Sequence, residues 1–199
     1  MKNIFLIITI TLISSLFKSQ SVVIDISDSE LNQPTGYYSK DMNNVLNQFE
    51  GTYLFTNGNT SLKIVLVKKI KQYNNSYYED LIIGEYQYIV NGVEKINTLS
   101  NLNVVYNNQF AKHAIAGSSP INNNNREWKC PQCNLNEKRL RAKIIDRTTD
   151  RHATILIRKT IVNGQEVLQV KVRDVLPDFE NVSPLEFSLP KGEFTMIKQ

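Results

Sequence analysis

Apolar and polar residues alternate along much of the chain after residue 51. Leu62, Ile64 and Leu66 are separated by single residues, and a run rich in β-branched and aromatic residues follows from 78 to 90. A period of two is typical of β-strands, because successive side chains point to opposite faces of a sheet. Counting such segments to the C-terminus predicts about seven to nine short strands in meander order, joined by short turns.

The dipeptide Asn163-Gly164 lies between two apolar alternations. Asn and Gly tolerate the positive φ angles of a two-residue type I′ turn, so the dipeptide predicts a tight hairpin. The resulting register pairs Ile157 with Val170 on one face and Arg158 with Gln169 on the other. One face is then apolar and the other largely polar, as a sheet with one buried side requires.

The same turn sequence occurs earlier in the chain, at Asn91-Gly92. Its two-residue register places Tyr88 opposite Lys95, which separates apolar and polar faces less well. We interpret the repeat as a turn used twice rather than as a duplicated domain, because few residues match.

One segment before the strands has helical spacing instead. Ser39 or Asp41 can cap its start and Gly51 can end it. Spacings of three and four residues place a set of apolar side chains on one helical face. That set is Met42, Val45, Leu46 and Phe49. We therefore expect one short N-terminal helix.

The N-terminus has the pattern of a secretory signal peptide. Lys2 gives a positive start, an almost purely apolar run extends from 4 to 17, and Ser19 and Ser21 are small residues at the expected cleavage positions. The apolar run is shorter than the ~20 residues of a membrane-spanning helix. We expect residues 1–21 to be removed and the protein to be exported, periplasmic or secreted, without an integral membrane segment.

The chain fits one domain. Its 199 residues, 41% of them hydrophobic, suffice for a single core. Residues 22–37 form a polar lead segment, and 38–199 form one β-rich domain. Within it, about 100–136 is the least regular part, with the asparagine run at 122–125 expected to be a mobile loop that builds no core.

The basic charge of the chain does not indicate nucleic-acid binding. Removal of 1–21 takes away Lys2 and Lys18 and no acid, so the net charge falls from +4 to about +2. An excess of Lys and Arg remains between 126 and 151, but Trp128 is the only aromatic residue there. Nucleic-acid surfaces interleave several aromatic residues with the basic ones. We expect a solvated strand face.

Cys130-Pro131-Gln132-Cys133 is the sharpest local motif. Outside the cytoplasm, paired cysteines usually oxidise, so we predict a disulfide between Cys130 and Cys133. A thioredoxin-like redox site would place the motif at a helix N-terminus within a βαβ unit, and the surrounding asparagines do not suggest one. A zinc site would need two further ligands, and neither histidine has the spacing to supply one.

Catalytic motifs are not evident. The sequence has no Gly-x-Ser-x-Gly elbow, no His-Glu-x-x-His and no phosphate-binding Gly-rich loop. His113 and His152 have no accompanying nucleophile motif, so we expect surface or turn positions. Glu79 and Asp80 are adjacent and point to opposite faces of a strand. A turn after 73 would place Asp80 opposite Lys69 as an ion pair. We predict no enzyme activity and no cofactor.

Tyrosines offer the best candidate for ligand binding. Tyr86 and Tyr88 share one strand face, and Tyr53 opens the first long strand. If these rings face a barrel interior, they form an apolar wall with polar tips, suited to a small amphipathic ligand. If they face a solid core or solvent, they are merely good strand formers.

Together these patterns predict an all-β fold, either an antiparallel meander barrel or a two-sheet sandwich with one short N-terminal helix. Gly51-Thr52-Tyr53 after a short helix is similar to the opening of lipocalin-like barrels, whose motif is Gly-x-Trp. Tyr53 replaces the Trp, and the later motifs of that family are not evident. The resemblance implies a barrel and covers the first element alone.

A second resemblance covers most of the mature chain. Besides the signal, the segments that carry it are NQFEGTYLFTNGNTSLKIVL at 47–66, YYEDLIIGEYQYIVNGVEKINTL at 77–99 and LPKGEFTMIKQ at 189–199. With these segments the chain resembles a family of small, uncharacterised secreted proteins of Bacteroidota-type bacteria. The resemblance implies export and a β-rich domain.

We expect a non-enzymatic protein that binds a small ligand or an envelope component in a β-barrel. The alternative is a structural or protein-interaction module of the cell envelope without a ligand pocket. A redox or metal-linked role of Cys130 and Cys133 ranks third. The expected partner is an unknown small molecule or an envelope protein, with no nucleic acid.

Overall fold

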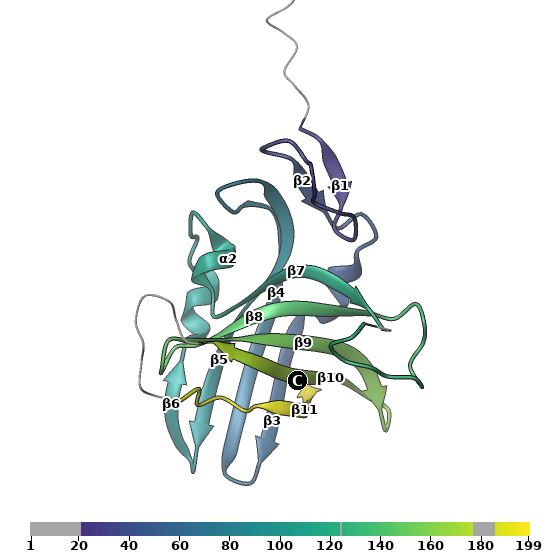
Figure 1. The fold of residues 1–199 in the computed structure, drawn as a ribbon. Coiled ribbons are helices and arrows are strands. Elements are labelled where there is room, and N and C mark those ends of the chain that lie inside the picture. Colours follow the sequence, from purple (N-terminus) through teal and green to yellow (C-terminus); the bar gives the residue numbers. More distant parts are fainter. Residues whose placement is uncertain (1–20, 124, 177–185) are drawn as a thin grey trace, which may run out of the picture.

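The computed structural model describes residues 21–123, 125–176 and 186–199 (Figure 1). The expected signal peptide lies outside these residues except for Ser21. None of the helices described is long and apolar enough to cross a membrane.

Strands dominate the described chain. In chain order, the elements are β1 (Val23–Asp25), β2 (Tyr38–Lys40), the 3-10 helix η1 (Val45–Phe49), β3 (Gly51–Asn57), β4 (Thr60–Tyr73), β5 (Tyr78–Val90), β6 (Val93–Asn97), the 3-10 helix η2 (Leu99–Asn103), α2 (Gln109–Lys112), β7 (Ile115–Asn122), β8 (Lys138–Asp146), β9 (Arg151–Val162), β10 (Gln165–Leu176) and β11 (Gly192–Lys198).

Eight of these strands form a closed antiparallel barrel. The ring runs β5-β4-β3-β11-β10-β9-β8-β7, and β7 pairs back to β5, with Ile82 opposite Gly117. This closure confirms the predicted all-β barrel and excludes the two-sheet sandwich. β1, β2 and β6 lie outside the ring, and Figure 1 shows β1 and β2 beyond one end of the barrel.

β5 is the strand that organises the others. Along one edge it pairs with β4 for almost its full length. Along the other edge its start pairs in parallel with β2, its middle with β7 and its end with β6. The barrel therefore closes over only a short part of β5, and the additional strands satisfy its remaining backbone groups.

Apolar side chains fill much of the barrel interior. Alternate residues of each strand point inward, as the two-residue period of the sequence predicted. The interior forms one continuous core that also includes Leu46 and Phe49 of η1. Among its largest fully buried members are Tyr53, Tyr86, Leu62, Ile64, Leu66, Ile82 and Ile115.

The predicted helix is a single 3-10 segment. Asp41 caps it, as one of the two expected caps, by accepting hydrogen bonds from the backbone N–H groups of Val45 at 2.7 Å and Leu46 at 2.9 Å. Phe49 is fully buried, but Met42 is 49% exposed. Met42 precedes the helix, so the predicted apolar face is shorter than its sequence spacing suggests.

A second apolar layer covers part of the barrel's outer wall. Leu81, Ile83 and Ala116 point away from the main core and form a separate cluster with Leu102 and Phe110. The last two residues belong to the segment with η2 and α2. That segment therefore packs against β5 and β7 from outside, which explains why Leu81 and Ile83 on the outer face of β5 are also buried.

The second Asn-Gly hairpin is confirmed. Ile157 pairs with Val170 and Arg158 pairs with Gln169, as the two-residue register predicted. Both central residues have positive φ, 50° at Asn163 and 77° at Gly164. These are the angles that a type I′ turn needs.

The first hairpin departs from its predicted register. Val90 pairs with Val93 across the turn, but Tyr88 lies opposite Ile96, because the register shifts between Tyr88 and Ile89. The prediction that Tyr88 lies opposite Lys95 is therefore wrong. The shift places Ile96 against the barrel core and leaves Lys95 exposed, which separates apolar and polar side chains better than the regular register.

The irregular region expected at about 100–136 contains more structure than its composition indicates. Residues 99–103 and 109–112 form η2 and α2, and Ile115–Asn122 forms β7. β7 is essential to the architecture, since it closes the barrel by pairing with both β5 and β8.

Candidate functional site

A cavity of about 670 Å³ lies at one mouth of the barrel. The β3–β4 hairpin, the end of β5 and the start of β11 form its wall. Phe55, Tyr88 and Phe194 supply its aromatic surface, and the rings of Phe55 and Phe194 lie 4.9 Å apart at an interplanar angle of 51°. The remaining lining residues are Thr56, Asn57, Thr60, Pro190, Lys191, Glu193 and Thr195.

Strand register brings these aromatic residues together. Phe55 on β3 pairs with Leu62 on β4, and Leu62 pairs in turn with Tyr88 on β5. Residues that pair across antiparallel strands share a face, so all three side chains point inward. Phe194 enters from the other side, opposite Val170 on β10. Phe55 and Phe194 were not predicted, because only the pairing of β3 with β11 makes them neighbours.

Tyr88 combines an apolar ring with an available polar group. It is 7% exposed and lines the cavity. Burial raises the pKa of its hydroxyl, so the group stays protonated at neutral pH and can donate a hydrogen bond. Within the described part of the chain, this hydroxyl makes no hydrogen bond.

Tyr53 and Tyr86, the other two predicted ligand-binding residues, lie in the packed core and are both fully buried. The Tyr53 hydroxyl donates to the carbonyl of Glu50 at 3.1 Å. The Tyr86 hydroxyl donates to the carbonyl of Ile145 at 3.1 Å and accepts from the N–H of Arg147 at 2.9 Å. Burial raises the pKa of both tyrosines, that of Tyr53 to about 12. Their hydroxyls serve the fold and do not reach the mouth.

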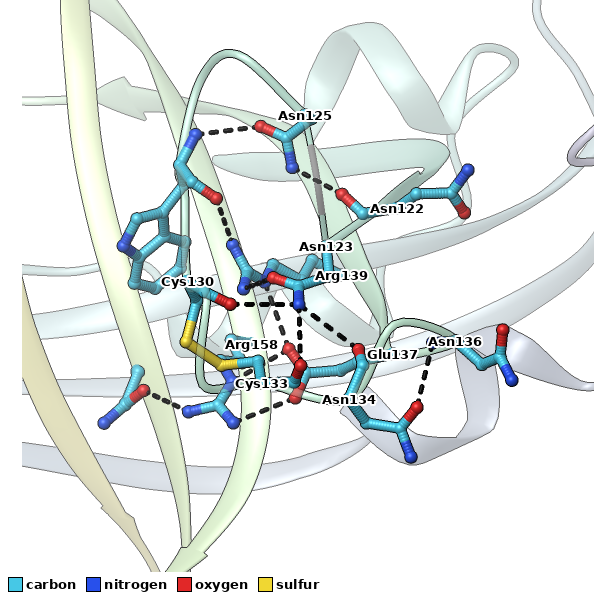
Figure 2. Close-up of polar contacts among 12 residues, drawn as sticks. Asn122, Asn123, Asn125, Cys130, Cys133, Asn134, Asn136, Glu137, Arg139 and Arg158 are labelled. Carbon is cyan, nitrogen blue, oxygen red and sulfur yellow. Dashed lines mark hydrogen bonds and ion pairs between the residues drawn. A yellow bond between two sulfur atoms is a disulfide. The ribbon is translucent and has the colours of Figure 1, made fainter.

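The predicted disulfide joins Cys130 and Cys133, whose Cα atoms are 5.3 Å apart (Figure 2). The backbone carbonyls of the two cysteines accept hydrogen bonds from the side-chain amide of Asn123, each at 3.1 Å. The same amide also donates to the carbonyl of Asn134 at 3.3 Å. The asparagine run was expected to be a mobile loop without a core, and that expectation is wrong for Asn123, which is fully buried. Its amide is the side-chain donor to the carbonyl of the buried Cys133, and it adds a second hydrogen bond to the carbonyls of Cys130 and Asn134, which also accept from backbone N–H groups.

Arg139 is the second centre of this network and is also fully buried. Its guanidinium donates to the side-chain oxygen of Asn123, to the carbonyl of Trp128 and, at 3.1 Å, to Glu137. It lies 5.0 Å from the centre of the Trp128 ring. The expectation that the basic residues between 126 and 151 are solvated is therefore wrong for Arg139, because the β7–β8 loop covers this side chain.

Glu137 connects two arginines. The guanidinium of Arg158 donates to both its carboxylate oxygens, at 2.8 Å and 2.9 Å, and also to Gln169 at 2.7 Å. Burial alone would raise the pKa of Glu137, but Arg158 and Arg139 outweigh it and hold that pKa below its usual range. A polar groove of about 340 Å³ lies between this network and the outer face of β9–β11. The guanidinium groups of Arg139 and Arg158, which line this groove, already donate hydrogen bonds within the protein.

His113 is not at the surface, as the sequence suggested, but fully buried. Its Nδ1 lies 2.8 Å from Glu85 and its Nε2 lies 2.7 Å from Gln109. These two contacts fasten α2 to the outer face of β5, and the His113 ring is closed off from solvent there. His152 lies on β9 and is partly buried.

The predicted ion pair between Asp80 and Lys69 does not form. A bulge between Lys69 and Gln72 shifts the register, so that Lys69 lies opposite Leu81. Asp80 instead accepts hydrogen bonds from the Tyr38 hydroxyl at 2.6 Å and from two backbone N–H groups. Among the residues described here, no three His, Cys, Asp or Glu side chains gather where they could hold a metal ion.

These features define a class of protein: a closed eight-stranded antiparallel barrel with a packed interior and one mouth lined by aromatic and polar side chains. The whole chain, residues 1–199, matches a family model described as "Family of unknown function (DUF6705)". The chain belongs to this family. No curated protein and no solved structure matches it.

Proposed function

We propose that the protein is an exported, non-enzymatic binding protein that holds a small amphipathic ligand in the mouth of its β-barrel. The observation that carries this proposal is the cavity walled by Phe55, Tyr88 and Phe194, with a volume of about 670 Å³. Small-molecule sites commonly have volumes of ~300–1,000 Å³ and apolar walls with a few polar groups. Export is supported by the N-terminal sequence pattern.

The lining defines the ligand chemistry. The two phenylalanine rings favour an apolar moiety, and burial of that moiety drives binding. Tyr88 donates a hydrogen bond from within the wall, and Lys191 and Glu193 provide polar contacts among the other lining residues. A ligand with an apolar body and one hydroxyl, carbonyl or carboxylate group fits this arrangement.

The size of the barrel agrees with a mouth site. An eight-stranded barrel has an interior that side chains nearly fill, with room for one small ligand at most. Tyr53 and Tyr86 occupy the deeper interior, so the ligand sits above them.

A non-enzymatic role is supported by the residues of the mouth. Among the described residues that line it, none is a histidine, cysteine or aspartate. The carboxylate that does line it, that of Glu193, is paired with Lys171 at 3.0 Å, whereas a catalytic nucleophile needs an adjacent base that activates it.

The alternative is an envelope structural or interaction module. The packed interior around Tyr53 and Tyr86 favours it, because such a barrel is a complete scaffold without any ligand. In that case the mouth is a surface depression, and a ligand does not copurify.

Native and denaturing mass spectrometry of residues 22–199, purified from an oxidising compartment, distinguishes the two. The proposal predicts a mass excess in the native spectrum only, or after incubation with lipid and metabolite extracts. Phe194→Arg should abolish the excess by placing a charge in the mouth. Ile197→Arg is the matched control, since Ile197 lies on the same strand and is 41% exposed. Equal native and denatured masses under both conditions would overturn ligand binding and leave the scaffold role.

A further inference from the structure

The polar groove beside the Arg139 network is a second cavity, with a volume of about 340 Å³. Small-molecule sites commonly have volumes of ~300–1,000 Å³. One wall is the outer face of the barrel, where Gln169 on β10 pairs with Arg158 on β9 and with Thr195 on β11, so the three side chains share a face. The β7–β8 loop contributes the other wall, with Trp128 and Gln132. The groove adjoins the barrel mouth, because the two cavities share three lining residues of β11.

Trp128 supplies the aromatic surface of this groove, and the protein holds it in place without a ligand. Its backbone N–H donates to the side chain of Asn125 at 2.8 Å, and its carbonyl accepts from Arg139. The Arg139 guanidinium lies 5.0 Å from the centre of the Trp128 ring, and the Cys130–Cys133 disulfide constrains the chain that follows. A side chain that is already ordered loses little conformational entropy when it contacts a ligand.

Most of the charged side chains that line the groove are neutralised within the protein. Glu137 accepts from both lining arginines (Figure 2), and the lining Glu193 pairs with Lys171 at 3.0 Å. Of the charged lining residues in the described chain, Lys129 alone has no ion-pair partner, and it is exposed. An ionic ligand would have to disrupt the existing pairs, so the groove favours an uncharged ligand.

Uncharged polar side chains in the groove are available to such a ligand. The side-chain oxygen of Gln169 accepts from Arg158 at 2.7 Å, while its amide nitrogen makes no hydrogen bond within the described chain and can donate. The side chains of Gln132 and Thr195 likewise make none among the residues described. These groups reach a ligand from both walls of the groove. Hydroxyl groups distributed around a ring match this arrangement better than the single edge of a planar base.

We propose that the polar groove binds an uncharged mono- or disaccharide. A pyranose ring has an apolar C–H face, which packs on an aromatic side chain, and hydroxyl groups around its edge. Trp128 contacts the C–H face, and Gln132, Gln169 and Thr195 hydrogen-bond the hydroxyl groups. A hydroxyl group both donates and accepts, so it can pair with an amide or with another hydroxyl. This site is additional to the amphipathic ligand proposed for the barrel mouth.

Trp128 is the only tryptophan in the sequence, so its fluorescence reports binding in the groove directly. Residues 22–199 are titrated with glucose, galactose, mannose, N-acetylglucosamine, cellobiose and N,N′-diacetylchitobiose, and calorimetry provides an independent measurement of binding. We expect at least one of these sugars to change the Trp128 emission along a saturating curve, with a Kd in the millimolar range or below. Sorbitol has similar hydroxyl groups without the ring and should produce no change. Adenosine tests for recognition of a planar base instead.

Three Gln→Leu variants test whether the sugar lies in the groove. Gln169→Leu and Gln132→Leu should each weaken binding by about tenfold, the effect of one lost hydrogen bond. Gln165→Leu is the matched control, because Gln165 lies on the same face of β10 as Gln169 but is exposed and outside the groove lining. Its affinity for the sugar should be unchanged.

Neither a saturable change in emission nor a heat of binding with any sugar of the panel would overturn the proposal. An equal response to sorbitol, or a stronger one to adenosine, would overturn the assignment to a saccharide. Equal affinities of the three variants would exclude the groove as the site. Gln132 is exposed in the loop, so Gln132→Leu decides this point even if Gln169→Leu disturbs Arg158 and the fold.

Discussion

The buried guanidinium of Arg139 donates a hydrogen bond to the side-chain oxygen of Asn123, and both residues are 0% exposed. The amide nitrogen of the same Asn123 holds the carbonyls of the disulfide loop (Figure 2). The side-chain oxygen of Asn123 thus accepts from the charged Arg139, and its side-chain nitrogen donates to the loop that covers Arg139. Burial of Arg139 and the conformation of the loop depend on each other.

Asn123→Ala should lower the free energy of unfolding by about 3 kcal/mol, because it removes one acceptor of the buried Arg139 guanidinium and the side-chain donor to the Cys133 carbonyl. Urea unfolding followed by circular dichroism measures the change. Asn136→Ala is the control, since Asn136 is exposed in the same loop and should cost less than about 0.5 kcal/mol. Similar effects for the two alanine variants would contradict the central position of Asn123.

Replacing both Cys130 and Cys133 by alanine should lower the free energy of unfolding by about 2 kcal/mol, the chain-entropy value for so short a loop. The loss is moderate because Asn123 still holds the loop carbonyls. Urea unfolding with and without dithiothreitol measures it. The reductant should destabilise the unaltered protein by the same amount and leave the double variant unchanged. A reductant effect on the variant would show that something other than this disulfide responds.

Tyr86→Phe and Tyr88→Phe form a matched pair on one face of β5. Tyr86→Phe should cost about 2 kcal/mol, because it leaves the carbonyl of Ile145 and the N–H of Arg147 unpaired. Tyr88→Phe should change stability by less than about 0.5 kcal/mol, since its hydroxyl has no partner in the described chain. Thermal unfolding of the two variants tests this order, and an equal or reversed cost would refute the assigned roles.

Much of the fold was predictable because local and long-range signals agree. The hairpin at Asn163-Gly164 has turn residues that require positive φ, and its register separates apolar from polar faces. The hairpin at Asn91-Gly92 has the same turn, but burial of Ile96 imposes a bulge that turn chemistry does not indicate. Local sequence determines the turn, and the core determines the register beyond it.

β7 could not be predicted from local sequence. Its Gly117-Ser118-Ser119-Pro120 composition is typical of a turn, and the strand forms because β5 and β8 both offer free edges to it. Gly117 also lies so close to Ala142 that an added Cβ would come within 2.5 Å of its side chain. The glycine therefore permits close packing of two strands.

The candidate site was predictable only in part. Alternation placed Tyr88 on an inward face, but Phe55 and Phe194 lie 139 positions apart in the sequence and meet only through closure of the barrel. Burial of Asn123 and His113 depends on partners from other segments, Arg139 and Glu85. A lone polar residue in the sequence does not reveal such partners.

We expect the stability of the fold to depend on pH through Lys143. Burial lowers its pKa from 10.5 to about 8, and the nearby charge of Arg147 adds to this effect. Between about pH 8 and pH 10.5, the unfolded chain therefore holds a proton that the folded protein has lost, so Lys143 makes stability rise with pH in this window. Below the window the residue is charged in both states, and its burial imposes a constant cost.

Lys143→Met removes this cost. The variant should be more stable than the unaltered protein at pH 7, and its advantage should shrink by on the order of 2 kcal/mol as the pH rises to about 10. Urea unfolding of both proteins from pH 7 to pH 10 measures the difference. Tyrosines with raised pKa values, such as Tyr86, affect both proteins equally and cancel. A difference that stays constant over this range would mean that Lys143 titrates normally, and that solvent reaches its ammonium group more freely than its packing against Phe110 implies.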